Sequence, residues 1–182
     1  NIRSVKNALD RIGIESLITD DADKLRAAEK VIFPGVGEAG TAMNYLRDRG
    51  LDDVIKNLKQ PFLGICLGMQ LMCSHSEEKD TECLGIFKEK VKRFPPKGIV
   101  PHMGWNDFTK AKGPLFEGIA ESDNMYFVHS YYAELGEDTI GETEYLIPFT
   151  SALQKGNFYG VQCHPEKSAD VGQKLLENFL KI

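Results

Sequence analysis

Cysteine and histidine are scarce in this sequence, and neither is spaced as in a common metal site. The four cysteines include no Cys-x-x-Cys pair, and the four histidines include no pair at i, i+4 with an acidic neighbour. These patterns give no sign of a zinc site, and a domain of this length does not need disulfides for stability. We therefore expect free thiols, no metal and no cofactor. The residues concerned are Cys66, Cys73, Cys83, Cys163, His75, His102, His129 and His164.

The sequence also lacks an excess of positive charge and any long apolar run. It carries 22 Lys and Arg against 27 Asp and Glu, a net charge of −5, which argues against a nucleic acid partner. The longest apolar runs, at residues 31–33 and 61–67, are far shorter than the ~20 residues that cross a bilayer, and no secretory signal opens the chain. We therefore expect a cytoplasmic protein with no membrane partner.

The length and composition are those of one globular domain. The chain has 182 residues, of which 42% are hydrophobic and 27% charged, so it can bury a sizeable core. No repeat, low-complexity tract or long linker divides it, and we predict a single domain over residues 1–182. The chain opens on a helical pattern and carries no initiator Met, which suggests that a first β-strand precedes Asn1.

The order of the predicted elements indicates an α/β fold. In the first half, short β-type runs alternate with helical patterns, as in βαβ units around a parallel sheet. From residue 84 onward strand-like segments dominate, with a hairpin turn at Lys155-Gly156-Asn157 and a last amphipathic helix. We therefore predict a three-layer α/β sandwich with a mostly parallel central sheet flanked by helices, plus antiparallel strands in the C-terminal half. The predicted strands are 15–18, 31–33, 62–65, 84–94, 100–108, 125–133, 145–154 and 158–163, and the predicted helices are 1–11, 23–28, 38–49, 52–58, 67–75 and 169–182.

One cysteine stands where a reactive nucleophile is expected. An apolar strand pattern ends in Gly64-Ile65-Cys66-Leu67-Gly68 and runs directly into a helix. This is the thiol counterpart of the nucleophile elbow, a strained turn that only small neighbours tolerate. The free N–H groups and the positive dipole end of the helix favour a reactive thiolate. For an isolated cysteine we would prefer a packing role, which is our interpretation of Cys73, Cys83 and Cys163, but the elbow pattern reverses that preference for Cys66.

A second segment could supply the proton shuttle that a thiolate needs. In His164-Pro165-Glu166, the proline biases His164 toward an extended backbone. Residues two apart in an extended segment project to one side, so Glu166 can reach the His164 ring, fix its tautomer and stabilise the imidazolium. The alternative is a strand-end histidine with a solvated glutamate nearby, which for this motif alone is about equally plausible. Beside the Cys66 elbow, a Cys-His-Glu triad is the better interpretation.

A glycine-rich turn follows the strand at residues 31–33. The glycines of Pro34-Gly35-Val36-Gly37 could let backbone N–H groups turn toward an oxyanion, with the N–H of Leu67 as the second donor. No Gly-Lys-Ser/Thr follows, so this is not a phosphate loop. By itself the motif is more often a plain turn, and it supports a reactive site only alongside Cys66.

These motifs resemble the class I glutamine amidotransferases over essentially the whole chain. The Cys66 elbow and His164-Pro165-Glu166 are typical of the broad family. Two further segments, Pro101-His102-Met103-Gly104-Trp105-Asn106 and Tyr126-Phe127-Val128-His129-Ser130-Tyr131, resemble its histidine-biosynthesis branch, the glutaminase subunits of imidazole glycerol phosphate synthases. The resemblance implies hydrolysis of glutamine to glutamate and ammonia through a cysteine thioester. It also implies a heterodimer with a (β/α)₈-barrel cyclase subunit, which uses the ammonia to make imidazole glycerol phosphate and an aminoimidazole carboxamide ribotide.

The resemblance further implies a role for each matching residue. Cys66 would be the nucleophile, His164 the general base and then acid, and Glu166 its orienting carboxylate. The chain departs from the family at Cys163, where members usually carry Phe, and we expect packing to absorb this smaller apolar side chain. The remaining assignments are an oxyanion hole at Gly37 and Leu67, substrate binding by Gln70, Ser130 and Tyr131, and a cyclase interface at Asn1, Trp105, Asn106 and Lys167.

Three other functions remain open from the sequence. A glutaminase subunit of another amidotransferase would share the triad but would not need Gly104-Trp105-Asn106. A free-standing cysteine hydrolase of the same fold would act on peptides without a partner. A non-catalytic binding module is disfavoured, because all three triad residues are present.

Overall fold

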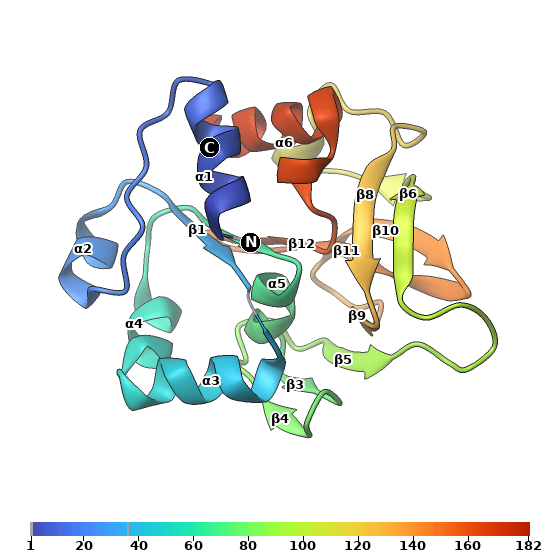
Figure 1. The fold of residues 1–182 in the computed structure, drawn as a ribbon, viewed down its shortest axis with the longest axis horizontal. Coiled ribbons are helices and arrows are strands. Elements are labelled where there is room, and N and C mark those ends of the chain that lie inside the picture. Colours follow the sequence, from blue (N-terminus) through green and yellow to red (C-terminus); the bar gives the residue numbers. More distant parts are fainter. Residues whose placement is uncertain (1, 36) are drawn as a thin grey trace.

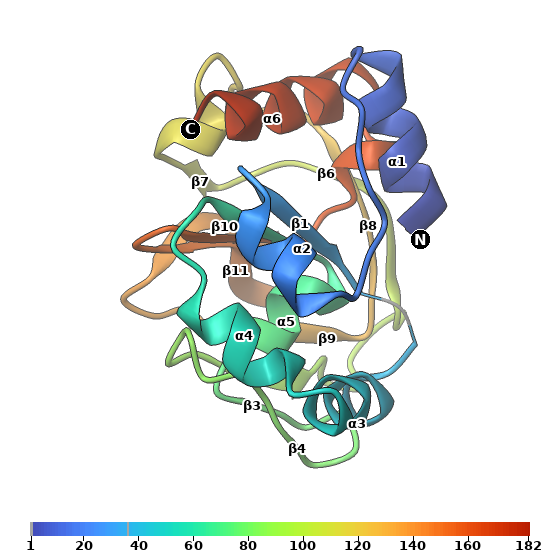
Figure 2. The ribbon, with the colours of Figure 1, turned by 90° about the vertical axis from the view of Figure 1, so that its left-hand side faces the viewer.

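A mixed β-sheet lies between two layers of helices (Figures 1 and 2). This computed structural model describes residues 2–35 and 37–182, and in these ranges no helix has both the length and the apolar character needed to cross a bilayer. The predicted three-layer α/β architecture is confirmed. Two helices, α1 (Ile2–Arg11) and α6 (Ala169–Lys181), cover one face of the sheet, α3 (Ala39–Asp48), α4 (Leu51–Asn57) and α5 (Leu67–Met72) cover the other, and α2 (Ala22–Ala27) contacts α4.

The parallel strands lie in the middle of the molecule. β2 (Phe62–Ile65) pairs in parallel with β1 (Val31–Pro34) on one side and with β12 (Phe158–Val161) on the other. All of β2 is buried, as expected for a parallel strand that is covered on both faces. Ile65 lies opposite Val161, so the chain leaves β2 and β12 at the same edge of the sheet. The segments that follow these two strands therefore start side by side.

The rest of the sheet is mainly antiparallel. β11 (Ile147–Lys155) and β12 form a hairpin through the predicted turn at Lys155-Gly156-Asn157. The strand order is β1-β2-β12-β11-β9-β5-β3-β4, with β10 paired to β11 and β7. The remaining elements of this region are β3 (His75–Ser76), β4 (Thr81–Glu82), β5 (Lys90–Arg93), β7 (Lys110–Ala111), β9 (Tyr131–Ala133), β10 (Thr139–Tyr145) and the 3-10 helices η1 (Pro114–Phe116) and η2 (Pro165–Lys167).

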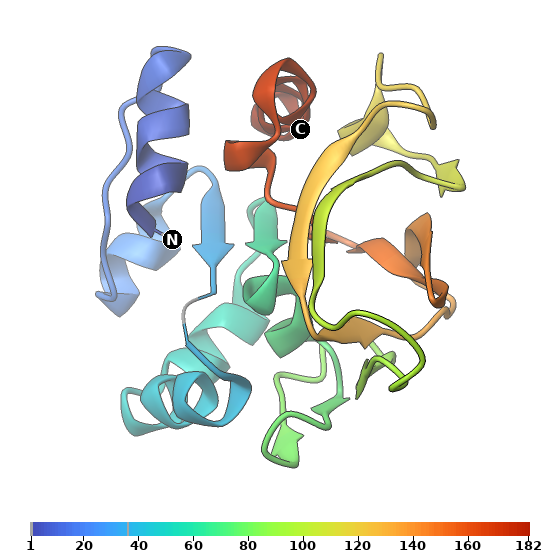
Figure 3. The same cartoon turned by 45° about the vertical axis from the view of Figure 1, so that its right-hand side comes forward.

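A separate two-stranded ribbon curves over one side of the molecule (Figure 3). It consists of β6 (His102–Asn106) and β8 (Met125–His129), paired antiparallel, and is called the β6–β8 ribbon below. Side chains alternate between its two faces. His102 and His129 are buried on the inner face, whereas Met103 and Trp105 are 63% and 55% exposed on the outer face.

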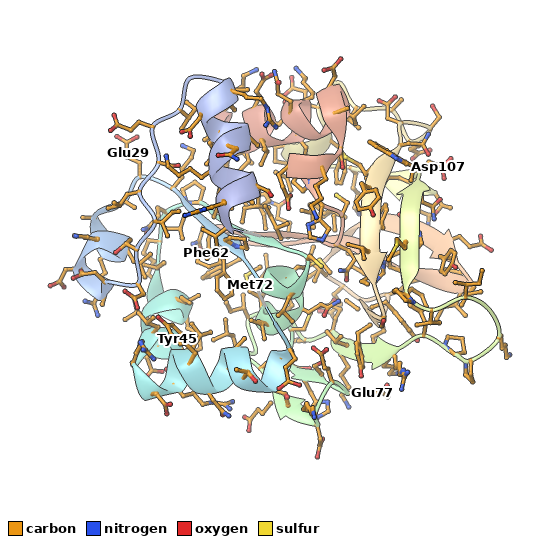
Figure 4. All side chains as sticks on the ribbon, viewed as in Figure 1. Glu29, Tyr45, Phe62, Met72, Glu77 and Asp107 are labelled. Carbon is orange, nitrogen blue, oxygen red and sulfur yellow. The ribbon has the colours of Figure 1, made fainter. Side chains whose placement is uncertain are left out.

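Each face of the main sheet has its own hydrophobic core. Alternation along β2 sends Leu63 and Ile65 to the core beneath α1 and α6, and Phe62 to the core beneath α3, α4 and α5. Phe62 and Met72 are fully buried and lie near the centre of Figure 4. The ring of Phe62 lies 5.6 Å from that of Phe158. This ring contact joins β2 to β12, and the site described below lies where β2 meets α5.

Most predicted helices and strands are confirmed within a few residues, but several segments differ, and the two-residue strands β3, β4 and β7 are not predicted. The predicted strand at 15–18 is wrong: no described strand pairs with it, and Leu17 and Ile18 are 69% and 53% exposed. Of the predicted strand at 84–94, only β5 forms. The mostly polar β10 is not predicted at all, and its pairing with β11 contains register shifts. Whether each of these segments forms a strand depends on a neighbouring strand with which it can pair, and a local sequence pattern does not reveal that neighbour.

Candidate active site

Cys66 lies at the sharp turn between β2 and α5. Its backbone has φ 53° and ψ −112°, a strained conformation for a residue with a side chain. Hydrogen bonds hold both sides of the turn, because Cys66 N donates to Val161 O at 2.8 Å and Cys66 O accepts from Gln70 N at 3.1 Å. The structure therefore places a strained cysteine at the edge of the parallel sheet and at the start of a helix, which is the geometry of the predicted elbow.

Two glycines let α5 start directly against the sheet. A Cβ added at Gly68 would lie 1.9 Å from the carbonyl oxygen of Phe33 on β1. A Cβ added at Gly64 would lie 2.8 Å from the backbone of Gly68. Both distances are far below a normal carbon contact, so a side chain at either position forces the backbone apart. The small neighbours predicted around Cys66 are thus required by the close approach of β1, β2 and α5.

His164 and Glu166 follow β12, at the edge of the sheet where β2 ends. His164 Nδ1 and Glu166 Oε1 are 2.8 Å apart, and both side chains are largely buried. The main chain of His164 is held from two sides, because His164 N donates to Tyr126 O at 2.8 Å and Ser168 Oγ donates to His164 O at 2.6 Å. The sequence predicted an extended segment here, but Pro165–Lys167 form the 3-10 helix η2. That turn brings Glu166 back onto the ring of His164.

The charge of His164 depends on its two neighbours. Burial alone would lower the pKa of His164, but hydrogen bonds to Cys66 and Glu166 and their negative charge outweigh burial and raise this pKa to about 9. An imidazolium with a carboxylate on one side and a sulfur on the other is the arrangement that a cysteine nucleophile needs. The structure thus brings Cys66, His164 and Glu166 together from distant parts of the sequence.

A glutamine that the sequence pattern did not single out also contacts Cys66. Gln162 follows β12 and is fully buried. Its Nε2 donates to Cys66 Sγ at 3.5 Å, and its Oε1 accepts from Gln70 Nε2 at 2.8 Å. Gln70 Nε2 also donates to Tyr131 O at 2.9 Å, so both of these predicted substrate residues are joined to Cys66 through Gln162. The sequence feature that could have identified Gln162 is its polar side chain at an otherwise apolar strand end, two positions before His164.

Of the two predicted oxyanion residues, one follows Cys66 directly and the other lies in the segment after β1. Leu67 is the first residue of α5, and Gly37 has φ 80° in the segment after β1. Val36 lies outside the described residues, so this turn is described only in part. A pair of N–H donors from Gly37 and Leu67 stays a prediction. The third predicted substrate residue, Ser130, already uses its carbonyl oxygen to accept from Phe94 N at 3.1 Å.

Two of the predicted partner-facing residues, Trp105 and Lys167, are exposed, whereas Asn106 lies on the opposite face of β6 from Trp105. Trp105 is exposed on the outer face of the β6–β8 ribbon, with its ring 5.9 Å from that of Tyr126. Lys167 is exposed on η2, beside Glu166. Asn106 turns to the other side of β6, where its Nδ2 donates to Glu144 O at 3.0 Å. The fourth predicted residue, Asn1, lies outside the described residues.

The other three cysteines lie in the hydrophobic cores. Cys73 and Cys163 are fully buried and Cys83 is 7% exposed. Burial raises the pKa of all three thiols, that of Cys83 to about 11. They are therefore protonated at neutral pH and poor nucleophiles, whereas Cys66 is partly exposed.

Two further histidines are buried under the β6–β8 ribbon. His102 Nδ1 and His129 Nε2 are 3.0 Å apart, and His129 Nδ1 donates to Tyr131 O at 2.7 Å. In the neutral ring, this second bond leaves Nε2 of His129 as an acceptor for the Nδ1–H of His102. Burial lowers the pKa of His102 to about 4 and that of His129 to about 3. The pair is not part of a metal cluster, since the described residues contain no group of three or more potential ligands.

Acid is expected to destabilise the fold through this pair. A histidine whose folded pKa lies below its usual 6.5 stabilises the fold fully above pH 6.5, and this contribution is lost as the pH falls toward the folded value. Each such histidine adds a slope of up to about 1.4 kcal/mol per pH unit to the unfolding free energy. The free energy of unfolding, measured with urea, should therefore fall less between about pH 7 and about pH 4.5 for His129→Gln than for the unsubstituted chain. His75→Gln, on the β3–β4 hairpin, is the control, and equal slopes for His129→Gln and the unsubstituted chain would contradict this expectation.

Comparison with known proteins gives matches over the whole chain. A family model described as "Glutamine amidotransferase class-I" matches residues 2–182. The chain is 56% identical to a Bacteroides thetaiotaomicron protein named "Imidazole glycerol phosphate synthase subunit HisH", with 100% of this chain and 94% of that protein covered. A protein of the same name from Shewanella loihica is 47% identical, with 100% and 86% covered. A solved structure titled "Crystal structure of glutamine amidotransferase" has a TM-score of 0.75 at 21% identity, covers 100% of this chain and 93% of that chain, and supports the fold alone.

Proposed function

This chain belongs to the class-I glutamine amidotransferase family, and on that basis we propose that it is the glutaminase subunit of an imidazole glycerol phosphate synthase. Relatives that are 56% and 47% identical carry that name. The subunit hydrolyses glutamine to glutamate and ammonia, and it passes the ammonia to a cyclase subunit in histidine biosynthesis. One observation carries the proposal: a strained Cys66 interacts with His164 and raises its pKa, and His164 Nδ1 lies 2.8 Å from Glu166 Oε1.

The proposed reaction starts with a proton transfer inside the triad. Cys66 Sγ gives its proton to His164 Nε2, because Nδ1 is held by Glu166. The thiolate attacks the side-chain amide carbon of glutamine, and the N–H groups of Leu67 and Gly37 hold the oxyanion. His164 then protonates the amide nitrogen, ammonia leaves and a glutamyl thioester remains. Water loses a proton to His164 and attacks the thioester, which releases glutamate and restores the thiol.

The substitution Glu166→Gln is expected to lower kcat for glutamine hydrolysis roughly 10²–10⁴-fold, with KM nearly unchanged. The amide keeps the shape of the carboxylate but does not stabilise the imidazolium, so the pKa of His164 should fall from its raised value of about 9. Steady-state kinetics and NMR titration of the His164 ring measure the two effects. Glu121→Gln, on the exposed loop before β8, is the control. An unchanged kcat in Glu166→Gln would show that this carboxylate is not needed.

A cyclase partner follows from the fate of the product. Ammonia released into bulk water is protonated and lost, so the site needs a sealed route to the enzyme that consumes it. We place the (β/α)₈-barrel cyclase against the outer face of the β6–β8 ribbon, where Met103 and Trp105 are exposed, and beside Lys167 on η2. Both surfaces adjoin the proposed triad, because His164 is hydrogen-bonded to β8 through Tyr126. Binding of the cyclase and its ligand is proposed to rearrange the oxyanion turn and switch on turnover.

The proposed function is tested by labelling and by turnover. A glutamine-mimicking diazo-ketone should modify Cys66, as located by mass spectrometry, and modification of Cys73 or Cys163 instead would overturn the site. Glutamine turnover should rise on addition of the ligand-loaded cyclase, and equal turnover with and without it would contradict the proposed activation. Capture of a different synthase would favour another amidotransferase subunit. Cleavage of peptides by the chain alone would favour a free-standing hydrolase.

A further inference from the structure

The polar contacts around Cys66 form a series of hydrogen bonds, and a backbone carbonyl at one end determines which atom of each side chain is the donor. The carbonyl Tyr131 O can only accept, so Gln70 must present its amide nitrogen to it, at 2.9 Å. The same Nε2 donates to Gln162 at 2.8 Å, which makes the contacted atom the carbonyl oxygen of the Gln162 side chain. The atom of Gln162 that faces Cys66 Sγ, at 3.5 Å, is therefore the amide nitrogen, a donor.

A donor aimed at the sulfur favours its charged form. A hydrogen bond to the ionised form of a group stabilises that form, and such bonds are stronger than bonds between neutral groups. Gln162 is fully buried, so water does not compete for its amide. Another neighbour of the sulfur has the opposite effect. Val128 O, at 3.9 Å, can only accept a hydrogen bond and therefore favours the protonated thiol. Gln162 thus acts in the direction that helps Cys66 transfer its proton to His164.

We propose that Gln162 is a positioning residue for Cys66, which stabilises the thiolate by donating a hydrogen bond to Sγ, and that Gln70 acts by holding the Gln162 amide in this orientation. Both hydrogens of Gln70 Nε2 are used in the two bonds described, so only its Oε1 is left for contact with glutamine. The biological role of this interaction rests on the proposed glutaminase function. The interaction itself concerns the ionisation of one thiol and is measurable without turnover.

The test follows alkylation of Cys66 by iodoacetamide in the full chain as a function of pH, with the modified residues located by mass spectrometry. Gln162→Met keeps the side-chain length but removes the donor, and we expect alkylation about tenfold slower at neutral pH. The rate should recover at alkaline pH, where the thiolate forms without the donor. Gln70→Met should show a smaller loss, and adding it to Gln162→Met should slow alkylation no further. Gln154→Met is the matched control, because the Gln154 amide donates to the Tyr159 hydroxyl, and it should behave as the unsubstituted chain.

Alkylation of the remaining cysteines distinguishes a misfolded variant from one that shows the proposed effect. Cys73, Cys83 and Cys163 are buried and are alkylated only in a variant that opens. If Gln162→Met opens, Gln162→Glu provides a second variant that keeps the contact with Gln70 but loses the donor, and slower alkylation is again expected. A neutral-pH rate within about twofold of the unsubstituted chain, or an equal loss at every pH, overturns the proposal. Neither result contradicts the proposed function, because that function is tested separately by glutamine turnover with the ligand-loaded cyclase.

Discussion

Alanine in place of Cys66 is expected to lower kcat for glutamine hydrolysis by at least about 10⁴-fold in the complex with the cyclase. Without Sγ no thioester can form, and water must attack the glutamine amide directly. The residues that remain, His164 and Glu166 at 2.8 Å, provide a base but no thiolate that can form the covalent intermediate. Glutamate release with saturating cyclase ligand measures the effect. Glutamine should still bind, because the substitution removes only one sulfur atom.

Cys83→Ala is the matched control for this substitution. Cys83 is 7% exposed, and burial raises the pKa of its thiol to about 11. We expect the control to keep kcat within about threefold, because a protonated core thiol takes no part in the reaction. If Cys66→Ala kept more than about 1% of the activity, or if Cys83→Ala lost as much as Cys66→Ala, the proposed nucleophile would be wrong.

One added methyl group at Gly68 is expected to cause the largest loss of stability. In Gly68→Ala the new Cβ would lie 1.9 Å from the carbonyl oxygen of Phe33. The clashing atom belongs to the backbone of β1, which is paired in parallel with β2, so it cannot move aside as a flexible side chain can. We expect the free energy of unfolding to fall by about 3 kcal/mol or more. Urea denaturation followed by circular dichroism measures this loss.

Gly40→Ala is the matched control, because Gly40 is the second residue of α3 as Gly68 is the second residue of α5. A Cβ at Gly40 would lie 3.3 Å from the nearest atom, the Cβ of Lys79. Alanine also favours a helix by about 1 kcal/mol over glycine. We expect the stability of this variant to stay within about 1 kcal/mol of that of the unsubstituted chain. Similar stabilities for Gly40→Ala and Gly68→Ala would mean that α5 is not packed against β1 as described.

The triad was predictable because each half of it is a local pattern. Gly64, Cys66 and Gly68 form one turn, and its glycines prove necessary for contacts made within that turn and with the neighbouring strand. His164 and Glu166 are likewise close in sequence, although a 3-10 turn and not an extended segment joins them. The two halves meet because β2 and β12 are parallel neighbours, a pairing that the sequence did not predict, since 158–163 was placed among the antiparallel strands of the C-terminal half.

What could not be predicted depends on contacts between distant segments. Gln162 matters through Gln70 and Cys66, which lie far from it in the sequence. The His102–His129 contact joins two strands that the pattern identified only as strand-like. The β-type run at 15–18 fails as a strand for the same reason, since strand formation there depends on a neighbouring strand and not on its own residues.

Strand β8 touches both halves of the proposed reactive pair through main-chain oxygens. Tyr126 O accepts from His164 N at 2.8 Å, and Val128 O lies 3.9 Å from Cys66 Sγ. Carbonyls two residues apart on a strand repeat about every 6.8 Å, so β8 spans the distance between the main chain of His164 and the sulfur of Cys66. A shift of β8 would therefore act on the His164 backbone and on the Cys66 thiol at the same time.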